Sequence, residues 1–486
     1  MVQEYKNYIN GKWVKSSSGK VFKNLNPANK RIIGVFQDSD EHDVSEAIES
    51  AENSLNEWRE TPAPKRAEYL YEIANLLRDD QERLTKIMVS EMGKVYKEAR
   101  GDIQEAIDIF EYMAGEGRRL FGITTPSELK NKFCMTTRIP IGVCGLITPW
   151  NFPIAIPSWK LAPALVGGNT VVFKPSSDAP LSALELVKII EKSGVPKGVV
   201  NFVTGSGKDV GDPLVKSKKV RCLSFTGSRD TGEHILRNAG LKKVGLELGG
   251  KNAIIVMDDA NLELAVEGII WGGFGTTGQR CTASSRVIVH KKVKNALENL
   301  LLNKVRRLKL GNGLDKNIDV GPLINEKAVE KSVMYTEVGK NEGAKLLIGG
   351  KVGNREGNFF QPTIFTNVKK NMRVAQEEIF GPVVCLITIE DIDEAIEVCN
   401  SISYGLSSSI YTKNLNNSFK AIEKIESGLI YVNSSTIGAE VHLPFGGVKD
   451  TGNGTREGSS GILEFTEEKT IYIDFSDKMQ KAQGID

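Results

Sequence analysis

The sequence predicts an α/β protein built around a parallel β-sheet with crossover helices. From Gly142 onward, short apolar runs typical of fully buried strands alternate with segments of helical periodicity. Several of these runs end in glycine-rich turns that lead into a helix, as at residues 205–211 and 226–232. The chain has 486 residues, of which 40% are hydrophobic, and this is enough for two to four domains with large cores.

The composition argues against several kinds of partner. Lysine and arginine number 63 and aspartate and glutamate 61, so the net charge of +2 gives no electrostatic reason to expect a nucleic acid or a membrane surface. Six cysteines without a CxxC pair and four widely spaced histidines predict reduced thiols and no bound metal. The N-terminus lacks a secretory signal pattern, and no apolar stretch nears the roughly 20 residues of a membrane span. We therefore expect a cytoplasmic protein.

The N-terminal part predicts a hairpin followed by helices. Residues 7–14 alternate around the Asn10-Gly11 dipeptide, which is typical of a tight turn between two strands. Apolar residues then recur at helical spacing between charged ones. The expected helices cover residues 43–56, 64–78, 80–92 and 96–120, and residues 130–138 are expected to form an edge strand.

The central part predicts the parallel sheet. Gly205, Gly207 and Gly211 follow its third strand as GxGxxxG, one residue longer than the dinucleotide-binding fingerprint, so this motif alone is weak. A phosphate-binding P-loop is excluded, because Phe202 stands where that motif needs glycine and Asp209 where it needs serine or threonine. The expected strands are residues 143–147, 170–173, 199–203 and 220–225, each followed by a helix, and residues 245–252 lead into a strand at 253–257.

The C-terminal half predicts a second α/β layer. Its tail, residues 469–475, alternates in strand fashion and is expected to pair with another sheet, within the subunit or across an interface. Other expected strands lie at 286–290, within 343–350, 359–365 and 377–384, and at 430–433, with helices at 293–307, near 326–339, and at 391–399 and 417–426.

Cys281 is the cysteine with the most functional surroundings. It follows Gly278, Gln279 and Arg280, which are poor material for a hydrophobic core, so we expect the thiol to be partly exposed and its pKa to be lowered by the adjacent cation. The other five cysteines lie in contexts that favour a structural role. They are Cys134, Cys144, Cys222, Cys385 and Cys399.

Seven motifs in a fixed order together resemble the aldehyde dehydrogenase superfamily over essentially the whole chain. Residues 154–159 and 437–445 are most similar to the branch that oxidises 2-oxoglutarate semialdehyde (2,5-dioxopentanoate). The seven motifs are residues 148–153 (TPWNFP), 173–175 (FKP), 225–228 (FTGS), 246–251 (LELGGK), 278–281 (GQRC), 377–382 (EEIFGP) and 444–447 (PFGG).

This resemblance implies a catalytic group of three residues. A thiolate at Cys281 attacks the aldehyde, and the Asn151 amide and the Cys281 backbone N–H stabilise the oxyanion of the thiohemiacetal. A thioester follows, and Glu247 acts as the base for its hydrolysis. From the residues alone, Glu247 could equally be a surface charge and Asn151 a turn residue before Phe152-Pro153, although Leu246 and Leu248 favour burial of Glu247.

The resemblance also implies a nicotinamide cofactor. Lys174 would contact the adenosine ribose, Gly227 and Ser228 the pyrophosphate, and Glu378 the nicotinamide ribose. Further cofactor residues implied in this way are Ile147, Thr148, Pro149, Trp150, Ser176, Ser177, Gly207, Gly211, Phe225, Thr226, Leu248 and Phe380.

Ser177 departs from the pattern of many NAD-preferring relatives, which place a glutamate at this position. Without that carboxylate a 2′-phosphate is not repelled, and Lys174 can pair with it. We therefore predict that NADP is accepted and preferred, with NAD as the alternative.

Substrate choice rests on fewer residues. Arg280 is a candidate clamp for a substrate carboxylate, although its side chain could instead point away and hold a loop. Phe445 is a second candidate substrate contact, and Glu457 resembles an acidic position that some relatives place near a proton exit, or forms a surface ion pair. The alternatives to 2-oxoglutarate semialdehyde are succinate semialdehyde, glyceraldehyde, and long-chain or aromatic aldehydes.

Two rival functions and an assembly complete the expectations. A cysteine hydrolase would need a histidine partner, and only His290 is near in sequence; a catalytically silent protein of this fold is disfavoured by Cys281, Glu247 and Asn151 together. The implied fold has a Rossmann-type cofactor domain, an α/β catalytic domain and a small β element for oligomerisation, giving a homodimer or homotetramer. The expected boundaries are 1–121 with 141–248, then 249–465, and 122–140 with 466–486.

Overall fold

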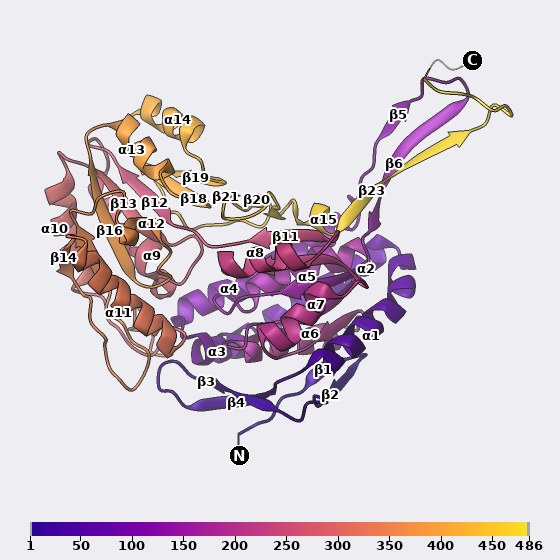
Figure 1. Cartoon of the computed structure of the whole chain (residues 1–486), viewed down its shortest axis with the longest axis horizontal. Helices are drawn as coiled ribbons and strands as arrows, with labels where there is room; N and C mark the ends of the chain where they lie inside the picture. The colour runs from indigo at the N-terminus through magenta and orange to yellow at the C-terminus, as the bar shows by residue number, and fades with distance from the viewer. Residues whose placement is uncertain (1, 484–486) are drawn as a thin grey trace.

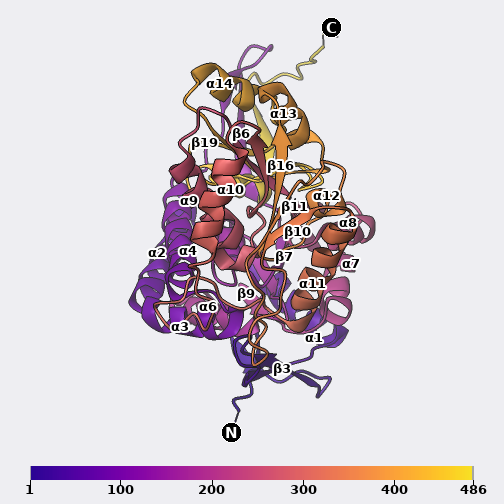
Figure 2. The same ribbon diagram turned by 90° about the vertical axis from the view of Figure 1, so that its left-hand side faces the viewer.

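The computed structural model describes residues 2–483. Two α/β halves face each other, and a long β arm projects from one of them, with the C-terminal end near its tip and the N-terminal end on the opposite side of the molecule (Figure 1). The view turned by 90° shows the second half in front of the first (Figure 2). The three largest sheets lie in these three parts of the molecule.

The first half contains the predicted parallel sheet. Its strand order is β11-β10-β7-β8-β9-β1-β2, in which the five strands from β11 to β9 are parallel. The chain order reverses beside β7, because β8 lies on one side of it and β10 on the other. The strands are β1 (Asn7–Ile9), β2 (Lys12–Val14), β7 (Val143–Ile147), β8 (Thr170–Lys174), β9 (Val200–Phe202), β10 (Val220–Thr226) and β11 (Lys243–Glu247).

The N-terminal hairpin is confirmed, and it extends this sheet. β1 pairs antiparallel with β2 and with β9. Asn10 and Gly11 both have positive φ, of 50° and 72°, which the two-residue turn between β1 and β2 requires.

The helices of this half pack around the sheet much as predicted. Helix α4 differs, because it ends at Glu116 and not near Leu120. Asp40 begins α1 with a capping box, and Ser228 caps α8 by accepting from the Thr231 N–H. The helices are α1 (Glu41–Glu60), α2 (Ala63–Asp79), α3 (Gln81–Met92), α4 (Tyr96–Glu116), α5 (Ala155–Gly167), α6 (Pro180–Lys192), α7 (Asp212–Lys216), which follows a π-helical turn at Gly207–Gly211, and α8 (Arg229–Asn238).

The second half has its own seven-stranded sheet, in the order β14-β15-β16-β13-β12-β18-β19. All neighbours in it are parallel except β14 and β15. The strands are β12 (Asn252–Val256), β13 (Ser284–His290), β14 (Lys345–Ile348), β15 (Thr363–Thr366), β16 (Val383–Ile389), β18 (Ser407–Tyr411) and β19 (Leu429–Val432). The helices are α9 (Leu262–Phe274), α10 (Lys294–Val305), α11 (Glu326–Asn341), α12 (Arg373–Gln376), α13 (Ile392–Asn400) and α14 (Leu415–Lys424).

Helix α9 and strand β18 pack closely on one another through glycine. A Cβ on Gly268 would lie 1.9 Å from the Tyr411 hydroxyl of β18, and one on Gly272 would lie 2.0 Å from Ser284 Oγ of β13. Only glycine permits this approach, and it brings the end of α9 against the sheet at the point where the chain enters the Cys281 loop.

The arm is a three-stranded antiparallel sheet in the order β23-β6-β5, made of β5 (Thr124–Pro126), β6 (Lys132–Pro140) and β23 (Thr466–Asp474). Nine residue pairs join β6 to β23, so the tail strand pairs within the subunit and β6 is the central strand, not an edge strand. Phe121, Tyr472 and Phe475 remain 71%, 68% and 61% exposed beside it.

Short elements complete the fold. β3 (Val21–Leu25) pairs with β4 (Ile32–Gln37) below the first sheet, while β17 (Tyr404–Gly405), β20 (Pro444–Phe445), β21 (Val448–Lys449), β22 (Glu457–Gly458) and α15 (Gly461–Glu464) connect the second half to the arm.

Candidate active site

The site lies where the chain order of the first sheet reverses, which is where α/β sheets bind ligands. Asn151 follows the end of β7, and Ser228 follows the end of β10. The loop that carries Cys281 comes from α9 of the second half and reaches this point. Two cavities, of about 260 and 580 Å³, both reach Cys281.

The backbone just before Cys281 is strained. Thr276 and Thr277 have φ of 49° and 58°, a left-handed conformation that β-branched residues rarely adopt. The Glu98 carboxylate of α4 accepts from the Thr276 N–H, with both oxygens 3.0 Å away, and the Thr277 hydroxyl donates to the Gly321 carbonyl at 3.0 Å. These bonds hold the turn and set the direction in which Cys281 points.

Two buried amides hold the rest of the loop. Gln279 accepts from the Ile324 N–H at 2.9 Å. Asn252 donates to the carbonyls of Cys281 at 2.6 Å and Ala283 at 3.0 Å. Neither Glu98 nor Asn252 was identified from the sequence as a site residue, although Asn252 directly follows the 246–251 motif.

The electrostatic surroundings of Cys281 differ from the prediction. Burial of the thiol raises its pKa, and the negative charges of Glu247 and Glu378 nearby raise it further, to about 12. The expected lowering by Arg280 is wrong because that guanidinium turns away, with Nε donating to Thr276 Oγ1 at 2.9 Å. The thiol must therefore lose its proton to a base when it reacts.

Arg280 forms part of the wall of the larger cavity. Its guanidinium pairs with Glu98 at 3.5 Å and stacks over the Phe152 ring at 5.2 Å. The side chain thus holds the loop and also borders the space beside Cys281. Its use as a carboxylate clamp stays a prediction.

Asn151 borders the smaller cavity beside the loop that carries Cys281. It is 3% exposed, and its Nδ2 donates to the Gln279 carbonyl at 3.1 Å, which leaves one amide N–H available. The amide is therefore fixed in orientation near Cys281, as an oxyanion donor must be.

Glu247 is a buried carboxyl without a partner. It ends β11, is 4% exposed, and neither of its oxygens has a hydrogen bond within the described part of the chain. Burial, with the Glu457 carboxylate nearby, raises the pKa of Glu247 well above its ordinary value. Glu457 is also buried and pairs with Lys160 at 2.6 Å, and both carboxyls border the larger cavity. Glu457 is therefore not a surface ion pair.

The smaller cavity is bordered by the loops that follow β7, β10 and β11. Glu378 Oε1 accepts from the Gly250 N–H at 2.8 Å, and Phe380, with a φ of 58°, packs edge-on against Trp150 at 5.5 Å. Lys331 of α11 also borders this cavity, without an ion pair or hydrogen bond in residues 2–483, and gave no motif signal in the sequence. Pro149, Thr226, Gly227, Ser228 and Leu248 also lie at this cavity.

Other predicted cofactor residues lie beyond this cavity. Lys174 ends β8, and burial lowers its pKa to about 8; its ammonium donates to the Pro175 carbonyl at 2.9 Å. Ser177 donates to the Gly205 carbonyl at 3.1 Å, and Gly211 faces the Lys174 side chain. Ile147 and Thr148 lie at the end of β7, Phe225 lies within β10, Ser176 lies in the loop after Lys174, and Gly207 begins the π-helical turn.

These residues fit a dinucleotide. Lys174, which within residues 2–483 is buried without a carboxylate partner, and the N-terminus of α8 capped by Ser228 favour an anionic group such as pyrophosphate. Glu378 keeps Oε2 free to accept from sugar hydroxyls, and the aromatic pair Trp150 and Phe380 borders the space next to Cys281.

The larger cavity opens on the other side of Cys281. Its walls are mostly apolar, and Phe445 packs edge-on against Trp159 at 5.6 Å within them. Trp271, which is 49% exposed, also borders it. None of the four histidines borders either cavity in the described structure, so a cysteine hydrolase lacks its expected partner. His290 accepts from the Lys292 N–H instead. Other wall residues are Lys97, Glu98, Gly101, Asp102, Glu105, Phe152, Ile156, Ile437, Gly438 and Ala439.

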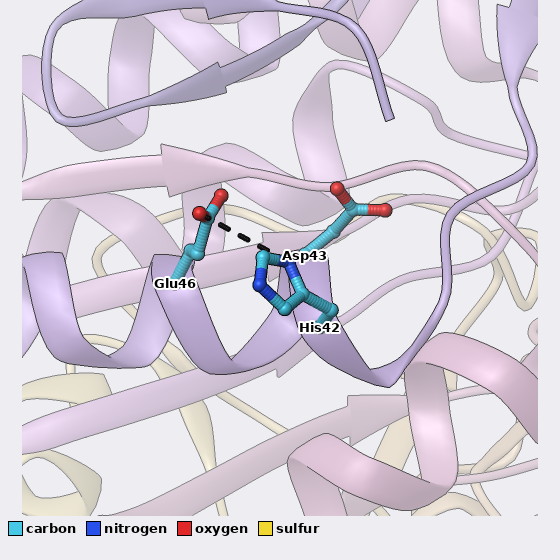
Figure 3. A group of neighbouring side chains, drawn as sticks. All are labelled: His42, Asp43 and Glu46. Carbon is cyan, nitrogen blue, oxygen red and sulfur yellow. Dashed lines mark ion pairs between the residues drawn. The ribbon is translucent and has the colours of Figure 1, made fainter. Parts of the chain in front are cut away.

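One group of side chains has the spacing of metal ligands. Figure 3 shows His42, Asp43 and Glu46 at the start of α1, where His42 and Glu46 form an ion pair at 3.9 Å. The Asp43 carboxylate accepts from the Ser16 hydroxyl at 2.5 Å and the Ser17 N–H at 3.0 Å. Those bonds and the capping box account for Asp43 without an ion.

Among residues 2–483, every helix is too short or too polar to cross a lipid bilayer.

Comparisons with known proteins agree with this geometry. A family model described as "Aldehyde dehydrogenase family" matches residues 13–471. The alpha-ketoglutaric semialdehyde dehydrogenase of Bacillus subtilis is 42% identical, over 96% of this chain and 98% of that protein. The 2,5-dioxopentanoate dehydrogenase of Saccharolobus solfataricus is 40% identical, over 95% and 98%.

Solved structures agree as well. The betaine aldehyde dehydrogenase of Staphylococcus aureus in complex with NAD+ superposes with a TM-score of 0.96 at 34% identity, over 99% of this chain and 97% of that one. An NADP-dependent enzyme of E. coli gives a TM-score of 0.95 at 38% identity, over 97% and 98%.

Proposed function

This chain belongs to the aldehyde dehydrogenase family, and we propose that its substrate is a carboxylated semialdehyde, with 2-oxoglutarate semialdehyde as the first candidate. The enzyme oxidises an aldehyde to a carboxylate with a nicotinamide cofactor. The observation that supports the site is that Cys281 lies where two separate cavities meet. One cavity has features suited to a dinucleotide, and the other can admit the aldehyde.

In the proposed reaction, Cys281 Sγ forms a bond to the aldehyde carbon while its proton goes to a base. The free N–H of Asn151 and the Cys281 backbone N–H stabilise the resulting oxyanion. When bound, the nicotinamide cofactor supplies the acceptor for the hydrogen and two electrons that leave the substrate carbon. Cys281 then carries a thioester.

Hydrolysis of that thioester is assigned to Glu247. A carboxyl with two unpartnered oxygens beside the thiol can accept a proton from water, and its raised pKa makes it a stronger base than an exposed glutamate. The adjacent Glu457 and Lys160 pair offers the next position for that proton.

We propose NADP as the preferred cofactor. Ser177, three residues after the buried Lys174, carries a hydroxyl instead of a carboxylate, so the side chain at this position does not repel a 2′-phosphate that pairs with the lysine. Ser177→Glu should lower kcat/KM for NADP by about 10- to 100-fold relative to NAD, as expected for about 1.4 to 2.7 kcal/mol of repulsion. A wild-type enzyme that strongly prefers NAD would contradict the proposal.

The substrate is tested with a panel of aldehydes at fixed cofactor. We expect the highest kcat/KM for 2-oxoglutarate semialdehyde, ahead of succinate semialdehyde, glyceraldehyde and long-chain or aromatic aldehydes. A clearly higher value for an uncharged aldehyde would reject the substrate class and leave the aldehyde dehydrogenase activity intact. Arg280→Ala in the same panel tests the clamp, since it should raise KM selectively for carboxylated aldehydes.

Assembly, division into domains and location form part of the same proposal. The exposed aromatic side chains on the arm favour burial against a second subunit, giving a homodimer or homotetramer. The division into a cofactor domain (1–121 and 141–248), a catalytic domain (249–465) and an oligomerisation element (122–140 and 466–486) follows the three sheets. We place the enzyme in the cytoplasm.

A further inference from the structure

Helix α4 forms one wall of the larger cavity through successive turns. Lys97, Glu98, Gly101, Asp102 and Glu105 all border it, at the spacing that puts them on one helix face. The other walls are largely aromatic and apolar, but they also carry Arg280, Glu247 and Glu457, so the charge of the cavity comes from these groups together with the helix face. That charge can be counted residue by residue.

Two of the three carboxylates on this face are neutralised by the protein itself. Asp102 pairs with Lys94 at 2.6 Å, and both side chains are fully buried. Glu98 pairs with Arg280 and accepts from the Thr276 N–H, so its charge is already used in holding the catalytic loop. Lys97 is exposed, where water screens its ammonium.

Glu105 is the exception on this face. In residues 2–483 its carboxyl has no ion pair and no hydrogen bond, although it borders the cavity. Asp102 and Asp108 of the same helix oppose its ionisation, while Lys94 and Arg280 favour it from farther away. Glu98 and Lys97 are the remaining charged groups on this wall. From other elements the cavity receives Arg280, which pairs with Glu98, Glu457, which pairs with Lys160, and the unpartnered carboxyl of Glu247.

We propose that Glu105 sets the charge preference of the aldehyde cavity, discriminating between carboxylated, uncharged and cationic aldehydes. This inference rests on the proposed function of the cavity as the aldehyde site. In the ionised form, Glu105 repels a substrate carboxylate and attracts a substrate cation across a space of low dielectric constant. In the protonated form, its O–H can donate a hydrogen bond to a substrate carboxylate.

The sign of the pH dependence follows from the surroundings of this carboxyl. Burial, with the Asp102 charge, raises the pKa of Glu105 to about 8. Below that pH the carboxyl is mostly neutral and tolerates an anionic substrate, and above it the carboxylate disfavours one. The same change favours a cationic aldehyde.

The test compares three four-carbon aldehydes with one enzyme: succinate semialdehyde, butanal and 4-(trimethylammonio)butanal. The ratio of kcat/KM for each charged aldehyde to that for butanal cancels the pH dependence that Cys281 and Glu247 impose on the chemical steps of all three. From pH 7 to pH 9 the anionic ratio should fall by about 5- to 10-fold, and the cationic ratio should rise. In Glu105→Gln both ratios should lose most of this pH dependence, and what is left reports the charge of Glu247 in the same cavity.

A matched control separates the local effect from a change in net charge. Glu111→Gln removes the same charge from the same helix at a side chain that pairs with Arg78 outside the cavity, and its ratios should follow the wild type. Equal behaviour of the two variants, or wild-type ratios that do not change with pH, would overturn the proposal. If the wild-type enzyme oxidised none of the three aldehydes, butanal included, the proposed function would be rejected instead.

Discussion

The two cavities that meet at Cys281 are built in different ways. The cofactor cavity is bordered largely by loops that follow parallel strands, where backbone groups, glycines and a helix N-terminus face the ligand. The aldehyde cavity is bordered largely by side chains of helices α4, α5 and α9 and of the loop around Phe445. A backbone site depends on the fold and suits a constant ligand, whereas a side-chain site can change with single substitutions and suits a variable one.

The largest expected effect is at Cys281, the thiol that borders both cavities. Cys281→Ala should lower aldehyde oxidation by at least about 10³-fold, because within residues 2–483 Cys281 carries the one thiol that borders both cavities. Cofactor affinity, measured by fluorescence titration, should stay within about twofold. Residual oxidation near the wild-type rate would show that the two cavities do not cooperate through this thiol.

The second effect separates the two half-reactions. Glu247→Gln should lower steady-state kcat by about 10²- to 10³-fold, since it removes the base for thioester hydrolysis. Only the deprotonated form of Glu247 can act as a base. Because its pKa is raised, wild-type deacylation should increase as pH rises through that pKa. Stopped-flow measurement should show the first turnover of the variant preserved, with accumulation of the thioester. Equal loss of both phases would assign Glu247 to formation of the thiolate instead.

The third effect concerns the wall of the aldehyde cavity alone. Lys94→Met leaves the Asp102 carboxylate buried without its cation and removes an ammonium 3.3 Å from the centre of the Phe152 ring. Unfolding by urea should show a loss of about 3 to 5 kcal/mol, as for other broken buried pairs.

A double variant provides the control for this stability effect. Lys94→Met with Asp102→Asn should recover most of the stability, since no unpaired charge then remains. Asp102 also accepts from the Ala155 N–H at 2.7 Å, and the asparagine oxygen can keep that bond. A double variant as unstable as the single one would mean that packing of the lysine, and not charge, stabilises this wall.

The difference between the cavities also explains what could be predicted from the sequence. Glycines and short motifs such as 225–228 have local signatures, so the sheet and many residues bordering the smaller cavity were identified, whereas Lys331 and its neighbours on α11 were not. The nucleophile and Glu247 belong to such motifs as well.

The aldehyde cavity carries no comparable local signature. In the sequence, α4 is an amphipathic helix, and Glu98, Asp102 and Glu105 are ordinary helix charges until tertiary packing brings Lys94 and Arg280 beside them. The pKa of Cys281 was predicted with the wrong sign for the same reason. Adjacency to Arg280 in the chain says nothing about where its guanidinium points, and here it points to Glu98.

Helix α9 shows a third limit of sequence reasoning. It was absent from the expected elements, because it consists mostly of apolar residues and glycines and has no continuous polar face that would show helical periodicity. The close contacts that require its glycines come from β13, β16 and β18, of which β16 and β18 are distant in the sequence.

The strained turn at Thr276 and Thr277 has a consequence for how this enzyme can evolve. A single carboxylate, Glu98, holds the backbone that aims the nucleophile and also fixes the cation that walls the aldehyde cavity. A substitution of Glu98 that changes substrate preference therefore also disturbs the position of Cys281 and lowers activity. Glu105 lies two turns farther along α4, and in residues 2–483 it has no hydrogen bond to that loop. Substitutions at Glu105 can therefore change substrate preference without disturbing the turn that Glu98 holds.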